Sequence, residues 1–129
     1  MIVIDEHFPE SQRQLLKGWR IRFRQIGYEI GRRGLKDSEI IPLLLQQRRL
    51  TFFTLDSDFD KSKYCHSHYS LVFLDINEYE AATFIRRFLK QRKFNTQAKR
   101  LGKIFRVTRT CISVRERHSE QGVRFEWTD

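Results

Sequence analysis

Short apolar runs alternate along this chain with stretches of helical spacing, and this alternation limits the possible folds more than any other feature. Three apolar runs are typical of buried strands: 2–4, 50–54 and 71–74. Three longer stretches place apolar residues on one helical face: 10–17, 37–45 and 77–93. The resulting β-α-β-α-β order predicts an α/β fold, with a mainly parallel sheet covered by helices.

The remaining segments complete one domain. Residues 19–25 alternate apolar and arginine side chains, which predicts a half-buried strand near a sheet edge. Residues 27–36 hold three glycines and predict a loop, and Pro42 predicts a local irregularity in the second helix. Residues 104–107 and 111–117 predict two antiparallel strands, with 123–127 a candidate third. We therefore expect a single domain over 1–129, with an α/β core at 1–94 and a basic β extension at 95–129.

The charge balance points to polyanions. The chain has 25 Lys and Arg against 16 Asp and Glu, a net charge of +9, and nucleic acid is the first partner that such an excess attracts. No apolar run approaches the ~18 residues of a membrane span. The N-terminus lacks the pattern of a signal peptide. Two cysteines give no disulfide framework, so a cytoplasmic location is expected.

Acidic residues follow the predicted strands at the points where those strands end. Asp5 and Glu6 follow the first strand, and Asp56 and Asp58 follow the strand at 50–54. Asp37 opens a helix whose N-terminus can face the same edge of the sheet, where clefts of parallel sheets lie. Carboxylates packed together repel one another unless a cation neutralises them, and Mg2+ or Mn2+ prefers such ligands. Such an ion activates water and stabilises the charge that develops in phosphodiester cleavage.

A purely structural interpretation of the same residues stays open. Asp37 is a favoured residue for capping a helix, and Asp56 and Asp58 are favoured in turns. Glu6 is equally suited to the surface.

Three motifs, in order, resemble the PIN-like domains related to VapC toxins. They are Ile-Val-Ile-Asp-Glu-His-Phe-Pro at 2–9, Arg-Gly-Leu-Lys-Asp-Ser-Glu-Ile at 33–40, and Thr-Leu-Asp-Ser-Asp-Phe at 54–59. That group typically has a first strand ending in Asp-Glu-Asn before a proline. A glycine-rich segment then leads to Asp-x-Glu-Ile, and Thr-x-Asp-x-Asp-Phe follows a later strand. The resemblance extends through the strand at 71–74.

The resemblance implies a Rossmann-like α/β/α fold and a Mg2+- or Mn2+-dependent ribonuclease of the toxin type. It places Asp5, Asp37, Asp56 and Asp58 at the catalytic metal positions. Further candidates for the surroundings of the metal or for substrate contact are Glu6, His7, Glu39, Arg33, Lys36 and His66. The partners that it implies are RNA, with tRNA among the candidate targets, a cognate antitoxin protein and a second copy of the chain.

Two departures from the group's pattern concern the site. His7 stands where the group usually has Asn, and would contact phosphate or cap the following helix. The glutamate helix of typical VapC proteins has no certain equivalent, and Glu39 is its only candidate replacement.

Residues 86–117 are dense in Lys and Arg, and Glu116 is the only acid among them. This density predicts a positive surface for phosphate contacts or for an acidic antitoxin peptide. Tyr79, Phe94 and Phe105 lie among these charges and are candidates for base stacking, with core packing favoured for the two phenylalanines.

Two other functional interpretations remain. A degenerate PIN-like module would bind RNA or an antitoxin without catalysis, and its RNA affinity would not respond to EDTA. A response-regulator-like receiver also gathers aspartates at strand ends. The chain lacks the receiver's single phosphoacceptor Asp with a later lone Lys, and it is too basic for that class.

Overall fold

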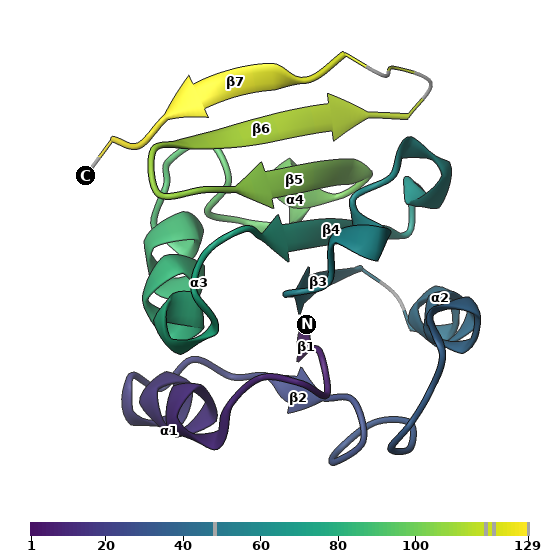
Figure 1. Ribbon diagram of the computed structural model, residues 1–129. Coiled ribbons are helices and arrows are strands. Elements are labelled where there is room, and N and C mark those ends of the chain that lie inside the picture. The colour runs from purple at the N-terminus through teal and green to yellow at the C-terminus, as the bar shows by residue number, and fades with distance from the viewer. Residues whose placement is uncertain (48, 118, 120, 129) are drawn as a thin grey trace.

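The computed structural model describes residues 1–47, 49–117, 119 and 121–128. Seven strands form one sheet in the order β2-β1-β3-β4-β5-β6-β7 (Figure 1). The strands are β1 (Ile2–Ile4), β2 (Arg24–Gln25), β3 (Leu50–Thr54), β4 (Tyr69–Leu74), β5 (Lys103–Val107), β6 (Cys111–Glu116) and β7 (Val123–Glu126). The α-helices are α1 (Glu10–Gly18), α2 (Asp37–Gln46), α3 (Ala81–Leu89) and α4 (Gln97–Arg100). Three short 3-10 turns are η1 (Ser57–Phe59), η2 (Ser62–Tyr64) and η3 (Glu78–Glu80).

The first five strands of the chain are parallel, and the last two are antiparallel to their neighbours. The α/β prediction with a mainly parallel sheet is therefore confirmed. The chain leaves β1 through α1 to reach β2 on one side, and then returns through α2 to β3 on the other side. The strand order thus reverses at β1. In open α/β sheets, such a reversal opens a crevice at the carboxyl ends of the two strands that flank it.

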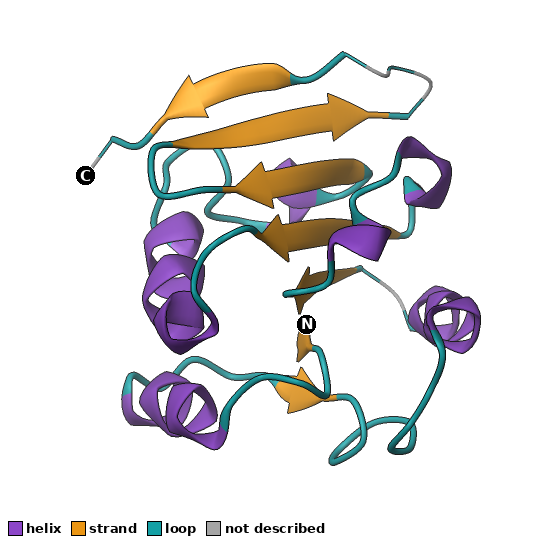
Figure 2. Cartoon of the chain, viewed as in Figure 1, coloured by secondary structure: helices purple, strands orange, loops and turns teal. Residues whose placement is uncertain are grey.

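Side chains that alternate along the strands supply two cores, one on each face of the sheet. Phe53 points to the core beneath α1 and α3, while its neighbour Phe52 points to the core beneath α2 and η1. Figure 2 shows the two helix layers on opposite sides of the strands. Burial on both faces explains why β3 and β4 are rich in apolar residues, and their few polar residues, Thr51, Thr54 and Ser70, are buried as well.

Gln12 connects α1 to α3 through a buried hydrogen bond. Its side-chain Oε1 accepts the backbone N–H of Ala82 at 2.9 Å, and the residue is only 3% exposed. Ala82 lies in the first turn of α3, where backbone N–H groups have no partner within the helix. A side chain from one helix therefore completes the hydrogen bonding of the other.

Arg100 connects the segment after α3 to the middle of the sheet. It is buried. Its Nε donates to Thr51 Oγ1 at 2.9 Å, and its Nη1 donates to the Phe94 carbonyl at 2.8 Å. Burial lowers the pKa of this guanidinium. Its buried position removes it from the positive surface that the sequence predicts.

The structure differs from the predicted elements in several places. Only Arg24–Gln25 of the predicted strand at 19–25 pairs, although it does pair at the sheet edge. Arg20 takes a φ of 60°, which breaks the extended backbone, yet the predicted alternation of half-buried and exposed side chains persists. The helix predicted at 77–93 is divided into η3 and the shorter α3. Pro42 does not interrupt α2.

The C-terminal strands continue the sheet rather than standing apart from it. β5 pairs with β4 in parallel, and β6 and β7 extend the sheet as the predicted antiparallel strands. No helix in the described part of the chain has the length and apolarity that crossing a membrane requires.

We predict that Gln12→Ala lowers the free energy of unfolding by about 1–3 kcal/mol, because it leaves a buried N–H of α3 without a partner. Urea unfolding followed by circular dichroism measures this change. Gln14→Ala is the matched control, since Gln14 lies on the exposed side of the same helix and its side chain donates to Glu10. Equal effects of the two substitutions would contradict the assigned role of Gln12.

Candidate metal centre

Aspartates from three segments lie at the point where the strand order of the sheet reverses. Asp5 directly follows β1, Asp37 is the first residue of α2, and Asp56 and Asp58 lie in the turn after β3. The parallel pairing of β1 with β3 brings the first and last of these segments to one edge of the sheet. Residues far apart in the sequence thus meet where the sequence predicts them to meet.

Three of these carboxylates lie close together. One oxygen each from Asp37, Asp56 and Asp58 lies within 4.8 Å of the other two. Oxygen ligands on opposite sides of a divalent cation are roughly 4–5 Å apart when each bond is ~2.1–2.5 Å long. The three oxygens are therefore close enough together to bind one hard cation.

Asp5 lies behind this group and is held by Thr54. The Thr54 hydroxyl donates to Asp5 Oδ2 at 2.7 Å and accepts the backbone N–H of Asp56 at 3.0 Å. Both Asp5 and Thr54 are buried. One hydroxyl therefore connects the end of β1 to the turn that carries the other carboxylates.

Burial raises the pKa of Asp5, and the negative charge of Asp56 raises it further. The hydrogen bond from Thr54 and the nearby His7 act in the opposite direction and lower this pKa. Burial is therefore the dominant influence on the most enclosed carboxyl of the site.

The pKa of Asp37 is also raised, first by burial and then by the charges of Asp56, Asp58 and Asp5. Lys61 partly opposes this shift. Asp37 thus experiences the repulsion of all three other aspartates, which a bound cation would relieve.

A second set of contacts fixes the turn after β1. The side-chain amide of Gln25 donates to the carbonyls of Asp5 and Glu6 at 3.1 and 3.2 Å. Arg13 in turn donates to Gln25 Oε1 at 2.7 Å and forms an ion pair with Glu29 at 2.6 Å. This network orients the backbone that carries Asp5.

The turn that carries Asp56 and Asp58 is held at both ends. Asp56 Oδ1 accepts the backbone N–H of Asp58 at 2.9 Å, so the turn interpretation of Asp56 is correct and compatible with its place in the cluster. Phe59 is buried and meets Phe52 edge to face at 5.4 Å.

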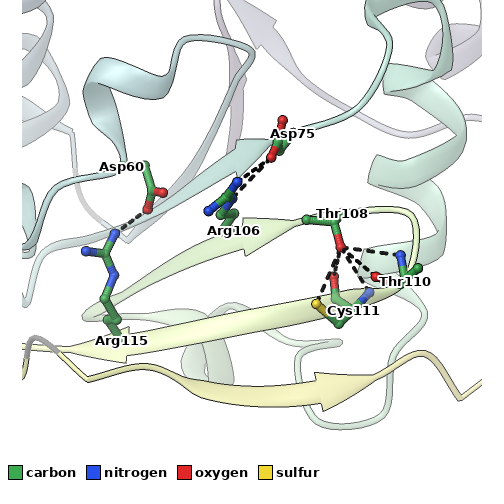
Figure 3. Close-up of polar contacts among 7 residues, drawn as sticks. All are labelled: Asp60, Asp75, Arg106, Thr108, Thr110, Cys111 and Arg115. Carbon is green, nitrogen blue, oxygen red and sulfur yellow. Dashed lines mark hydrogen bonds and ion pairs between the residues drawn. The ribbon is translucent and has the colours of Figure 1, made fainter.

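Arg115 fastens the end of the same turn to the sheet. Its guanidinium on β6 pairs with Asp60 and also donates to Ser62 at 3.2 Å. Figure 3 shows Arg115 reaching from its strand to Asp60.

Glu6 and Glu39 bind neighbouring loops. Both Glu6 carboxylate oxygens accept the backbone N–H of Gly34, at 3.0 and 3.1 Å. Glu39 accepts the backbone N–H of Lys36 at 3.2 Å and pairs with Arg32 at 3.0 Å. Lys36 is the N-cap residue of α2, so Asp37 is not the cap that the structural interpretation assigned to it.

The other candidates for substrate contact lie in different places. His7 is exposed, and its charge acts on Asp5. Arg33 lies over the ring of Tyr28, 5.0 Å from its centroid. His66 stacks on Tyr69 at 5.7 Å, at the start of β4. His66 is therefore at the amino edge of the sheet, opposite the aspartates, and does not join them.

Three residues that support the site have no role assigned from sequence: Thr54, Gln25 and Arg115. A polar residue at the end of an apolar run was an available signal for Thr54. Gln25 lies 20 residues from Asp5, and Arg115 lies 55 residues from Asp60. No local sequence pattern therefore predicts their contacts.

Two arginines of the basic run are paired with acids. Arg106 pairs with Asp75 at 2.6 Å and Arg109 with Glu80 at 2.5 Å, both through acids outside the run (Figure 3 shows the first). Phe94 and Phe105 are in the core, whereas Tyr79 is 63% exposed.

No family model matches the chain, and neither the curated proteins nor the solved structures contain a match.

We predict that ionisation of Asp5 destabilises the metal-free protein as the pH rises from about 4 towards neutral. The pKa of Asp5 is raised in the folded state, so the folded state binds more protons in this window than the unfolded state does. Asp5→Asn should therefore raise the melting temperature in EDTA at pH 7 by about 2–6 °C, which corresponds to about 1 kcal/mol for a domain of this size. The difference should vanish below pH 4.

Thermal melts between pH 3.5 and 7.5 measure the effect. Asp75→Asn is the control, because Asp75 pairs with Arg106 and its loss should not stabilise the protein. A lower melting temperature for Asp5→Asn at pH 7 would refute the assigned cost of this buried charge.

Proposed function

We propose that this chain is a metal-dependent endoribonuclease with a PIN-like, Rossmann-like α/β/α domain. The observation that carries the proposal is the convergence of aspartates from three segments at the reversal point of a mainly parallel sheet. The net charge of +9 supports a polyanionic substrate. The resemblance of the three motifs supports the toxin class, a cytoplasmic location, a cognate antitoxin and a homodimer.

The donor set fits Mg2+ or Mn2+. Asp37, Asp56 and Asp58 would hold the cation through carboxylate oxygens, the ligands that these hard ions prefer. When bound, the ion supplies Lewis-acid stabilisation of the charge that develops on the phosphate. Asp5 lies next to this set and completes the four positions that the motifs indicate.

The chain's own groups suit the remaining tasks. Asp5 has a raised pKa and its Oδ2 accepts a hydrogen bond from Thr54, so in this proposal it would accept a proton from an attacking water molecule. His7 acts electrostatically on Asp5 and Lys61 acts on Asp37, and in this proposal the two side chains would contact the phosphate. Neither step requires His66.

A catalytically degenerate RNA- or antitoxin-binding module is the second candidate. The observation that favours it is the engagement of Glu39, whose carboxylate binds Lys36 N–H and Arg32. The only replacement for the glutamate helix of typical VapC proteins is thus occupied in capping α2. The two candidates differ in whether RNA is cut when a divalent ion is present.

We predict that purified protein cleaves a panel of tRNA and single-stranded RNA with Mg2+ or Mn2+ and not with EDTA. Asp56→Asn should lower cleavage by more than about 100-fold, since loss of even an outer partner of a metal ligand costs about 10–100-fold. Gel electrophoresis of end-labelled RNA measures the rate. Asp75→Asn serves as the control and should cut normally. RNA binding without cutting under every metal would transfer the assignment to the non-catalytic module.

We also predict that Thr54→Val lowers Mn2+ affinity and the cleavage rate by about 10–100-fold, because it removes the bond that orients Asp5 and the acceptor for Asp56 N–H. Isothermal titration with Mn2+ measures the affinity separately from the rate. Thr54→Ser keeps the hydroxyl and should restore both. Unchanged Mn2+ affinity in a folded Thr54→Val protein would remove Thr54 from the site.

A further inference from the structure

A groove lies in the helix layer formed by α1 and α3, away from the aspartates. Two adjoining cavities, of about 550 and 370 Å³, share Trp19, Arg86 and Lys90 in their walls. We call this the Trp19 groove. Its other lining residues are Ile21, Thr83, Arg87, Leu89, Gln91 and Thr128. Its volume lies in the range of small-ligand sites, roughly 300–1,000 Å³.

The charge of the groove has one sign. Among the described lining residues, every charged side chain is a cation and none is a carboxylate. Within the part of the chain that the structure describes, the Lys90 ammonium has no hydrogen bond or ion pair. Arg86 lies over Trp19 with its guanidinium carbon 4.5 Å from the ring centroid, and it forms no ion pair with an acid among the described residues. Cations in the last turn of α3 also interact favourably with the helix dipole. That interaction alone does not account for the aromatic and apolar side chains beside them.

The groove also has apolar walls beside these cations. Trp19 and Ile21 are half-buried, and Leu89 lines the same hollow. An aromatic wall bordered by cations is the arrangement with which proteins bind single-stranded nucleic acid without reading its sequence.

We propose that the Trp19 groove binds single-stranded RNA, with a base against the Trp19–Ile21 wall and the adjacent phosphates on Arg86 and Lys90. The choice of RNA rests on the proposed function, while the groove itself does not depend on the metal centre. It gives the protein a second RNA contact, remote from the aspartates and independent of divalent ions. An acidic peptide would satisfy the cations but would not cover the apolar wall beside them.

Fluorescence anisotropy of a labelled oligouridylate, measured in EDTA to prevent cleavage, tests the proposal. Arg86→Ala/Lys90→Ala should weaken binding by at least about 10-fold and reduce the slope of log affinity against log salt by about 1–2. Arg32→Ala/Lys63→Ala removes the same charge on the α2 side of the sheet and is the matched control. Equal weakening by the two double variants would overturn the proposal, because it would show only a general charge effect.

Trp19→Leu tests the aromatic contact and should weaken binding by at least about 5-fold. Because Trp19 packs against the core, Arg86→Lys provides a second variant that keeps the charge and the fold. Arg86→Lys should bind RNA nearly as tightly as the parent protein. If its RNA affinity falls as far as that of the double alanine variant, the charge of residue 86 does not contact a phosphate. Polyglutamate that binds in the groove while oligouridylate does not would also overturn the RNA assignment.

Failure of this proposal is distinguishable from failure of the proposed function. Groove variants that bind RNA normally would leave the metal-dependent cleavage result intact. If the protein binds RNA through the Trp19 groove but does not cut RNA with any metal, the nuclease proposal is wrong and the groove proposal stands.

Discussion

The parallel pairing of β1 with β3 is the contact on which the rest of the molecule depends. Ile4 faces Phe53 in the register of these strands, and the backbone N–H of Asp5 continues the pairing with the Phe53 carbonyl at 3.1 Å. This register places Asp5 beside Thr54, and therefore beside the turn that follows it. A shift by one residue would turn the apolar side chains of both strands to the wrong faces and separate the carboxylates.

The same arrangement concentrates negative charge in a partly buried place, and the structure compensates only in part. The Thr54 hydroxyl and the charge of His7 favour the ionised form of Asp5, yet burial keeps its pKa raised. Hydrogen bonds from Gln25 hold the backbone of the same turn without neutralising the carboxylate. The folded protein therefore carries an electrostatic cost at these aspartates, and perturbed carboxyls of this kind are common at functional sites.

The sequence predicts the central architecture well because that part depends on local periodicity. The apolar runs that become β1, β3 and β4 are buried on both faces, and their ends position Asp5 and Asp56. Residues 19–25 show where local periodicity fails to predict a strand. Their side chains do alternate between half-buried and exposed, but the backbone at Arg20 is not extended. The supporting contacts of the site escape prediction because they are long-range, and a side chain such as Arg115 carries no local sign of its partner.

The contact between Arg115 and Asp60 bears on where a boundary can be drawn in this chain. The connection from β3 to β4 contains only the short turns η1 and η2, so no α-helix holds the acidic turn against the sheet. Part of that task falls to β6, more than fifty positions later in sequence. The sequence suggests a boundary after residue 94. In the structure that boundary would separate Arg115 from the loop after β3, which it holds through Asp60. The C-terminal strands therefore help to hold the turn that carries Asp56 and Asp58. They cannot be replaced without changing the contacts of that turn.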